Sequence, residues 1–356
     1  MFIQRITRLL SLILAATAFG GAADAQERTK LVFAPTTTSI TTGHAAHSSI
    51  PLTAGFWKEE GLDVEVIGLQ GSTAGIQQVA SGQVHFSSVG GEDVMKARAK
   101  GVPIISVYTY ARKPIYRIVA PADTPITKPE HLKGKTIGVP NMAVGSVAFT
   151  RATLKTAGID PDKDVKWLAV GLGAPALNAL KKKDIDVYAV WDTEIASFEN
   201  TGIKFNLIVP PWNDEMLGNV VITHEDILAK HPEWIIKLVR GIAKASIYGL
   251  TNPEASIRNH WKVYPQTKPQ GVDEAEALKK AKHVFLSRFD LLRLEPGVKW
   301  GQNMDGVWKR MADLAIQEKM IPADFNVVAA YTNRFIDDIN KFDAKKIEAM
   351  AKQSKW

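Results

Sequence analysis

Hydrophobic and polar positions along this chain follow a repeated order of strand, turn, helix and strand. The clearest example spans residues 55–92, where Leu62, Val64 and Val66 alternate with polar residues before a glycine-rich turn and an amphipathic helix. A short apolar strand follows at 86–89. Both strands end in small polar residues. The pattern predicts an open α/β sheet, which binds its ligand at the carboxyl ends of its strands.

The same pattern predicts elements along the rest of the chain. A strand at 31–34 leads into a hydroxyl-rich loop and a helix that carries Ile50 and Trp57, with Ser48 or Ser49 as its N-cap. Further strands are predicted at 104–110, 115–120, 136–139, 165–169, 187–190, 205–209 and 219–223, and further helices at 144–157, 174–182, from 232 onward, 253–264, 273–285, 305–318 and 344–352. A chain of this length exceeds a typical single core, which favours two lobes.

The first 25 residues have the pattern of a secretory signal. Arg5 and Arg8 precede an apolar run at 9–19, and small residues lead to Ala25. We expect cleavage after Ala25. The alternative is an uncleaved anchor helix, but glycines shorten the apolar run below the ~20 residues that span a membrane.

Composition and charge exclude several classes of function. The 356 residues contain no cysteine, so there is no disulfide, thiolate metal site or thiol nucleophile. No cysteine can be lipidated after the signal, and we therefore expect a free, monomeric protein in the periplasm. The formal net charge is +7, or +6 without the predicted signal, which carries two arginines and one aspartate. The densest basic run, Lys181–Lys183, has no interleaved aromatic residues, so nucleic acid is not an expected partner.

Four segments together resemble a known protein family. They are FWKEEGLDVEV with the GST turn and QQVASGQVHFSSVG after it (56–90), LKGKTIGV (132–139), ALKKKDIDVYAVWD (179–192) and HPEWIIKLVRGIAKA (231–245). In this order they resemble the solute-binding proteins of ABC importers for taurine, alkanesulfonates, nitrate and thiamine-pyrimidine precursors. The resemblance covers nearly the whole mature chain, and it specifies the fold and role better than the ligand.

The resemblance implies a type II periplasmic binding protein with two α/β lobes joined by two crossing strands. Lobe 1 would comprise 26–112 and 224–356, and lobe 2 would comprise 113–223. The protein would capture a solute in the cleft between its lobes, close around it, and present it to an ABC permease with its cytoplasmic ATPase. An alternative partner is a membrane sensor.

The resemblance also extends to an enzyme. Fungal pyrimidine-precursor synthases share this fold and use a cysteine-rich iron segment and a lysine-bound pyridoxal phosphate. This chain has no cysteine, and no G-x-S-x-G, H-E-x-x-H or P-loop pattern is present. We therefore expect a binding protein without a cofactor, and an exported cofactor-pathway enzyme is the less favoured alternative.

The candidate ligand contacts lie at strand ends and helix starts. Turns that lead into helices supply free backbone N–H groups and the positive end of the helix dipole, which suits a small anion. Arg112 could pair with a sulfonate or carboxylate, and Trp191 could stack on an organic body. The predicted ligand-binding set is Thr37, Thr38, Ser39, His44, Ser72, Thr73, Ser88, Gly91, Glu92, Tyr110, Arg112, Met142, Gly145, Ser146, Gly173, Trp191 and Asp192.

Each of these residues also has an ordinary structural role open to it. The turn hydroxyls could cap their own helices, Arg112 could form a hinge salt bridge, Trp191 could belong to the core, and Asp192 could cap a helix. His44 and His47 have no third metal ligand near them, so we expect hydrogen bonding and no metal. The expected ligand is a small organic anion, either a sulfonate or a carboxylate. A pyrimidine, thiamine-precursor or flavin-type solute is the alternative.

Overall fold

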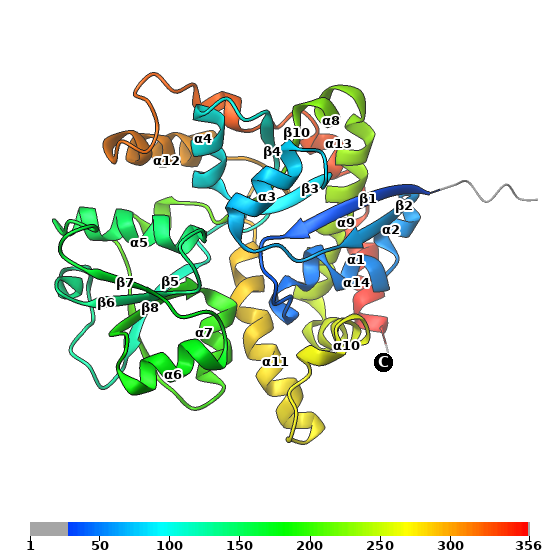
Figure 1. Cartoon of the computed structure of the whole chain (residues 1–356). Coiled ribbons are helices and arrows are strands. Elements are labelled where there is room, and N and C mark those ends of the chain that lie inside the picture. Colours follow the sequence, from blue (N-terminus) through cyan, green and yellow to red (C-terminus); the bar gives the residue numbers. More distant parts are fainter. Residues whose placement is uncertain (1–27, 355–356) are drawn as a thin grey trace, which may run out of the picture.

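The computed structural model describes residues 28–354, which form two α/β lobes side by side (Figure 1). The first lobe contains a sheet of strand order β2-β1-β3-β10-β4. Its strands are β1 (Thr29–Pro35), β2 (Leu62–Val66), β3 (Phe86–Gly90), β4 (Ile104–Thr109) and β10 (Asn219–His224). Strand β1 runs parallel to β2 and β3, whereas β10 runs antiparallel to β3 and β4.

The second lobe repeats this arrangement with the strand order β7-β6-β8-β5-β9. Its strands are β5 (Tyr116–Pro121), β6 (Thr136–Val139), β7 (Lys166–Ala169), β8 (Val187–Trp191) and β9 (Phe205–Ile208). Strand β6 is parallel to β7 and β8, and β5 is antiparallel to β8 and β9. The predicted α/β fold with two lobes is confirmed. The predicted second lobe runs to residue 223, but β10 lies in the first sheet, so the chain re-enters that sheet at Asn219.

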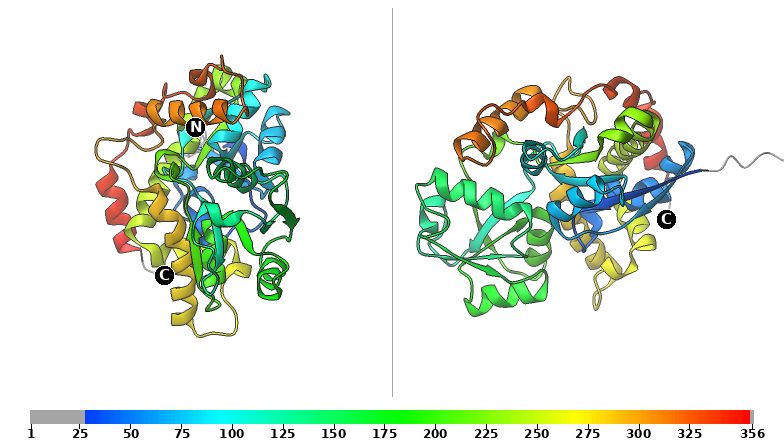
Figure 2. Two further views of the ribbon diagram at one scale, coloured as in Figure 1. Left: turned by 90° about the vertical axis from the view of Figure 1, so that its left-hand side faces the viewer. Right: turned by 45° about the horizontal axis from the view of Figure 1, so that its top comes forward.

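Helices cover both sheets, and the C-terminal helices return to the first lobe (Figures 1 and 2). The helices are η1 (Thr42–His47), α1 (Ser49–Thr53), α2 (Phe56–Glu59), α3 (Gly71–Ala80), α4 (Gly91–Ala99), η2 (Pro129–Leu132), α5 (Gly145–Thr156), α6 (Ala174–Lys182), α7 (Asp192–Glu199), η3 (Asn213–Glu215), α8 (Glu225–Lys230), α9 (Pro232–Thr251), α10 (Pro253–Val263), η4 (Pro265–Thr267), α11 (Glu274–Phe289), η5 (Asp290–Leu292), α12 (Asp305–Gln317), η6 (Val327–Ala330), α13 (Ile336–Ile339) and α14 (Ala344–Gln353). Within residues 28–354, none of them is long and apolar enough to cross a membrane. The predicted signal segment lies outside the described residues.

Two predicted helices differ from the observed ones. The helix expected around Ile50 is divided into α1 and α2, and Gly55 adopts the left-handed conformation (φ 78°) that ends α1 and starts α2. The loop predicted before it contains η1. The predicted N-caps bond elsewhere: the Ser48 hydroxyl donates to the carbonyl of His44, and the Ser49 hydroxyl contacts Nδ1 of His260. The helix predicted to end at 285 continues to Phe289, which adds a turn that proves important for the cleft.

Helix α9 packs against the rest of the first lobe through a close contact with one tryptophan. Trp57 is buried, and its indole N–H donates to the carbonyl of Leu238 at 2.9 Å. The ring lies against Gly241, where an added Cβ would be 2.3 Å from Trp57 Cδ1. A glycine is therefore required at this position of the helix, although alanine is the better helix former by about 1 kcal/mol.

We predict that Gly241→Ala lowers the free energy of unfolding by about 1–3 kcal/mol, because the added methyl group overpacks the contact with Trp57. Urea denaturation measures the change. Gly306→Ala in the first turn of α12 is the matched control, since a Cβ there meets no atom closer than 3.6 Å. The control should be neutral or slightly stabilising, and equal losses in both variants would contradict the packing argument.

Candidate functional site

A small cavity lies between the lobes, where strand ends of both sheets meet. The first lobe and its C-terminal helices contribute Pro35, Thr36, Thr37, His44, Gly71, Ser72, Ser88, Asn219 and Arg288, and the second lobe and the crossing segment contribute Ile115, Tyr116, Val144, Gly145 and Trp191. We call this space the cleft pocket. Its cavity volume is about 30 Å³, which is room for one or two water molecules. The two lobes are therefore closed on one another.

Helix N-termini from both lobes reach the cleft pocket. Helix α3 of the first lobe begins at Gly71, and α5 of the second lobe begins at Gly145. The two starts lie close together, because a Cβ at Gly71 would be 3.0 Å from the carbonyl oxygen of Ala143. The first N–H groups of a helix have no partner within it, and the helix dipole adds roughly half a positive charge. This geometry favours a negatively charged group.

Tyr116 stands against the start of α5. A Cβ at Gly145 would be 1.9 Å from the Tyr116 hydroxyl oxygen, so only glycine allows this approach. The Tyr116 ring also contacts Phe149 at a centroid distance of 5.9 Å. Burial raises the pKa of Tyr116 well above its usual range, and the nearby carboxylates of Glu92 and Asp93 raise it further. The hydroxyl therefore remains protonated and can donate a hydrogen bond.

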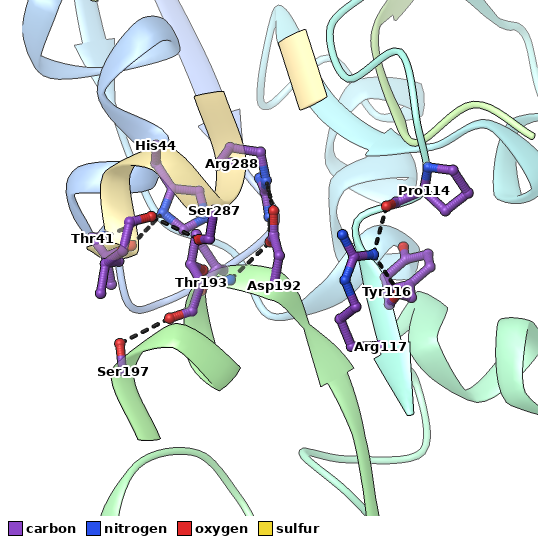
Figure 3. A network of polar contacts seen from close by, with 12 residues as sticks. Thr41, His44, Pro114, Tyr116, Arg117, Asp192, Thr193, Ser197, Ser287 and Arg288 are labelled. Carbon is purple, nitrogen blue, oxygen red and sulfur yellow. Dashed lines mark hydrogen bonds and ion pairs between the residues drawn. The ribbon is translucent and has the colours of Figure 1, made fainter. Parts of the chain in front are cut away.

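A buried ion pair joins the two lobes beside the cleft pocket (Figure 3). Arg288 at the end of α11 donates from Nε to Asp192 Oδ2 at 2.7 Å and from a second nitrogen to Oδ1, and each side chain is only 2 % exposed. Asp192 is the first residue of α7, and its Oδ1 also accepts from the N–H of Thr193. The contact is bidentate, and the carboxylate of Asp192 neutralises the positive charge of Arg288, which lines the cleft pocket.

His44 is held as a neutral imidazole. Its Nδ1 accepts from the backbone N–H of Thr41 at 3.1 Å, so the proton is on Nε2 (Figure 3). Burial lowers the pKa of His44 well below its usual range, and the positive charge of Arg288 lowers it further. Burial, together with Arg288, also lowers the pKa of His47 to about 3. His44 can therefore offer an N–H donor to a ligand without adding charge.

The structure brings together part of the predicted ligand-binding set. Six of its residues line the cleft pocket: Thr37, His44, Ser72, Ser88, Gly145 and Trp191. Asp192 lies beside the pocket but is occupied by Arg288. Tyr110 does not line it, and its ring lies 4.3 Å from that of His47. The part that these residues play in binding stays a prediction.

Other predicted residues have different surroundings. Arg112 pairs with Glu295 at 3.1 Å and donates to the carbonyl of Gln302. It therefore forms a salt bridge, which was the alternative to ligand contact. The Ser146 hydroxyl is fully buried and donates to the carbonyl of Ala189. Gly91 is closely packed, since an added Cβ would lie 2.6 Å from Cδ1 of Leu217. These three residues do not line the cleft pocket.

The remaining predicted residues line neighbouring spaces or a turn. Thr38 and Ser39 face a separate groove beside α7 and α11, and Thr73 and Met142 face another outside α5. Gly173 adopts a positive φ of 65° and donates its N–H to Glu194 Oε1 at 2.5 Å, which holds the start of α6. Glu92 lines an apolar space next to Tyr116.

The sequence reasoning missed Thr36, Tyr116, Asn219 and Arg288. Tyr116 and Asn219 are the first residues of β5 and β10, and a search limited to the carboxyl ends of strands does not find them. Arg288 lies in a helix far along the chain, and no local pattern connects it to the cleft. Within residues 28–354, no group of three or more His, Cys, Asp or Glu side chains could hold a metal ion.

Comparison with known proteins places this geometry in a family. A sequence profile described as NMT1/THI5 like matches residues 50–256, which is more than half of the chain. The chain belongs to the NMT1/THI5-like family. The resemblance inferred from the sequence motifs is thus confirmed.

Curated relatives of the chain include both binding proteins and enzymes. A formylaminopyrimidine-binding protein of Halalkalibacterium halodurans is 27% identical over 57% of this chain and 62% of its own length. A riboflavin-binding protein, RibY, of Chloroflexus aurantiacus is 24% identical over 79% of each chain. A 4-amino-5-hydroxymethyl-2-methylpyrimidine phosphate synthase of Saccharomyces cerevisiae is 22% identical over 80% of this chain and 82% of its own.

Solved structures show the same fold. A protein of Bordetella bronchiseptica RB50 has a TM-score of 0.69 and 20% identity, and the match covers 88% of this chain and 98% of that one. The alkanesulfonate-binding protein SsuA of Xanthomonas axonopodis pv. citri, bound to MOPS, has a TM-score of 0.61 and 16% identity over 86% of this chain and 99% of its own. These likenesses show the fold of periplasmic binding proteins.

We predict that breaking the buried ion pair is costly and that removing both partners is not. Arg288→Met should lower the free energy of unfolding by about 3–5 kcal/mol, because it leaves Asp192 buried and unpaired. Arg288→Met with Asp192→Leu should recover most of that loss. Lys309→Met, in an exposed ion pair with Asp313, is the control and should cost less than about 1 kcal/mol. Denaturation at neutral pH measures all three, and a double variant as unstable as the single one would contradict the prediction.

We also predict that Glu92 destabilises the fold as pH rises. Burial, and next the charge of Asp93, raise the pKa of Glu92 to about 8. The folded state therefore keeps this proton between about pH 4.5 and 8, whereas the unfolded state loses it. The free energy of unfolding of Glu92→Gln, relative to that of wild type, should therefore rise by at least about 1.4 kcal/mol from pH 4.5 to pH 8. This minimum is the free energy that corresponds to one pKa unit. Glu65→Gln, at an exposed position of β2, should show no such trend, and a flat difference for Glu92→Gln would refute the assignment.

Proposed function

We propose that this protein is the solute-binding component of an ABC importer and that it captures a small organic anion between its lobes. One observation carries this proposal: the starts of α3 and α5, one from each lobe, converge on a pocket with aromatic walls. Two helix N-termini offer backbone N–H groups and positive potential to one anionic group. An acidic head bound there would hold both lobes together.

The balance of charge in the pocket favours an anion with a single negative charge. Arg288 is already neutralised by Asp192, so the side chains that line the pocket add no net charge. The positive potential comes from the helix starts, and hydroxyls such as those of Ser72 and Tyr116 supply further donors. The Trp191 ring offers a flat apolar surface for the rest of the solute. A sulfonate or carboxylate with an aromatic or alkyl body matches these groups.

Capture requires the lobes to separate. The closed cavity of about 30 Å³ is too small for an organic anion, so a solute enters only when the lobes open. The chain crosses between the lobes after β4 and after β9, and these segments provide the hinge. Closure then removes water from the ligand and strengthens its hydrogen bonds. The closed form is what we propose is presented to the permease and its cytoplasmic ATPase.

The proposal includes a location and an assembly state. The charged and apolar pattern of the first 25 residues supports export with cleavage after Ala25, and the lack of cysteine supports an unlipidated protein in the periplasm. We propose that it acts as a monomer, since capture and closure involve only the two lobes of one chain.

The synthase relatives raise the question of turnover. Pyridoxal phosphate chemistry would need a lysine in the cleft, and no lysine is among the described residues that line the pocket. No cysteine exists in the chain to bind iron. These features support binding without conversion of the solute.

A second candidate ligand is a neutral pyrimidine or flavin-type solute, and Asn219 favours it. The Asn219 side chain lines the cleft pocket, and its Oδ1 is buried without a hydrogen-bond partner. The N–H of a heterocycle would supply that partner. The names of the formylaminopyrimidine-binding and riboflavin-binding relatives point the same way.

The two ligand classes can be separated by matched compounds. Thermal shift and calorimetry would compare benzenesulfonate with benzenesulfonamide, which has nearly the same shape without the charge, together with benzoate, formylaminopyrimidine and riboflavin. If helix starts bind an anion, we expect the sulfonate to bind at least tenfold more tightly than the sulfonamide. A saturating ligand at 100 times its Kd should add about 2.7 kcal/mol of stability.

Two variants connect the result to the pocket. Trp191→Ala should weaken binding of aryl anions, and Asn219→Leu should weaken only heterocycles that donate an N–H. Binding of heterocycles alone, lost in Asn219→Leu, would establish the second candidate in place of the first. No binding by any compound, with an intact melting transition, would count against both.

A further inference from the structure

A second cavity lies on the other side of Tyr116. It has a volume of about 40 Å³ and is built by both lobes, from α5 and Trp212 on one side and from α4 and α12 on the other. Figure 1 shows α4 and α12 above α5 at this edge of the molecule. Among the described residues, Tyr116 alone lines both this cavity and the cleft pocket. Tyr116 is therefore the wall between the two spaces, and both lie at the interface that opening of the lobes would separate.

The walls of the second cavity are apolar apart from one carboxyl group. Phe149, Met216 and Met311 are among its lining residues, and the indole N–H of Trp212 is already bonded to Thr156 at 3.0 Å. Methionine side chains are flexible and adapt to the shape of an apolar ligand. The walls suit an aromatic or alkyl body, but the volume of about 40 Å³, like that of the cleft pocket, admits one only when the lobes move apart.

Glu92 is the polar exception. Its Oε1 has no contact with solvent and no hydrogen-bond partner. The nearest cation, Lys96, pairs at 2.6 Å with Asp93. An acceptor enclosed in this way costs free energy unless a donor meets it. The raised pKa of Glu92 reflects the same enclosure.

We propose that the second cavity is a subsite of the solute-binding cleft, that it takes the aromatic body of the solute, and that Glu92 accepts a hydrogen bond from an N–H on that body. This inference rests on the proposed function. The acidic head would lie at the starts of α3 and α5, and the body would extend past Tyr116. The solute class narrows to organic acids whose aromatic part carries an N–H. Nitrate and short alkyl sulfonates would fill only the cleft pocket.

The test uses two probes that lack the acidic head, so it does not depend on the anion site. Indole and benzofuran have nearly the same shape, but only indole donates an N–H. Calorimetry on the mature protein should show that indole binds roughly tenfold more tightly than benzofuran, the effect of one hydrogen bond to a carboxyl group. In Glu92→Met the two probes should bind equally. Glu65→Met, at an exposed position of β2, is the matched control and should keep the preference for indole.

Substitutions that fill the second cavity test whether the probes bind there. Ala315→Phe adds a ring to the second cavity from α12, and Ala152→Leu fills it from α5. Either variant is sufficient for the test, provided that it folds. Loss of probe binding in the filled variant supports the assignment. Retained binding would place the probes elsewhere and overturn it.

The remaining outcomes separate this inference from the proposed function. Failure of both probes to bind wild type would overturn the second subsite, even if benzenesulfonate binds. Equal binding of indole and benzofuran to wild type would overturn the role of Glu92. If indole binds with the predicted dependence on Glu92 while no anion or heterocycle in the panel binds, the subsite stands and the proposed ligand class fails.

Discussion

The buried pair of Arg288 and Asp192 is the interaction on which the cleft depends. Each charge is almost completely removed from water, and the cost of that removal is offset only while the partner is in bidentate contact. The pair therefore fixes the end of α11 against the start of α7 in one geometry. It also sets the electrostatics nearby, since the guanidinium helps to keep His44 and His47 neutral. The cleft is left with polar groups and without free charge from side chains.

The position of this pair also suggests how the molecule opens. The backbone N–H of Asp192 donates to the carbonyl of Ile115 in the crossing segment, so the pair lies next to the hinge. Contacts at the opposite edge are weaker: Thr73 reaches the carbonyl of Ala143 at 3.5 Å, and the Lys155 to Glu318 ion pair is partly exposed. Buried interactions at the hinge and exposed ones at the far edge favour rotation about α11. In the proposed motion, the edge that contains α3, α5 and α12 is the one that opens.

The sequence predicted the fold well because the fold follows from local periodicity. Strand β6 and helix α6 have the predicted bounds, since alternation and helical spacing depend on neighbouring residues. Local information also has limits. The left-handed Gly55 divides a helix that the apolar pattern presents as continuous, and only the backbone conformation reveals the break.

The site could be predicted only in part, because a cleft is assembled from segments far apart in the chain. Gly145 and Ser146 were equally good candidates from the sequence. One step along α5 turns Ser146 toward Ala189 in the second lobe, while Gly145 faces Tyr116. Arg112 was the predicted cation because it stands beside Tyr110 at the crossing between the lobes. Arg288 lines the cleft pocket instead, paired with Asp192, since α11 returns between the lobes and extends one turn beyond its predicted end.

Under the proposed function, selection of a solute in this cleft depends on geometry more than on net charge. The chain has a formal charge of +7, yet the cleft pocket contains a neutralised arginine, and the adjoining cavity contains a glutamate that burial keeps protonated near neutral pH. A highly charged anion would gain little from such surroundings and would lose its hydration on closure. A weakly hydrated head at two helix starts, with an apolar body on the far side of Tyr116, loses less water and gains more contact.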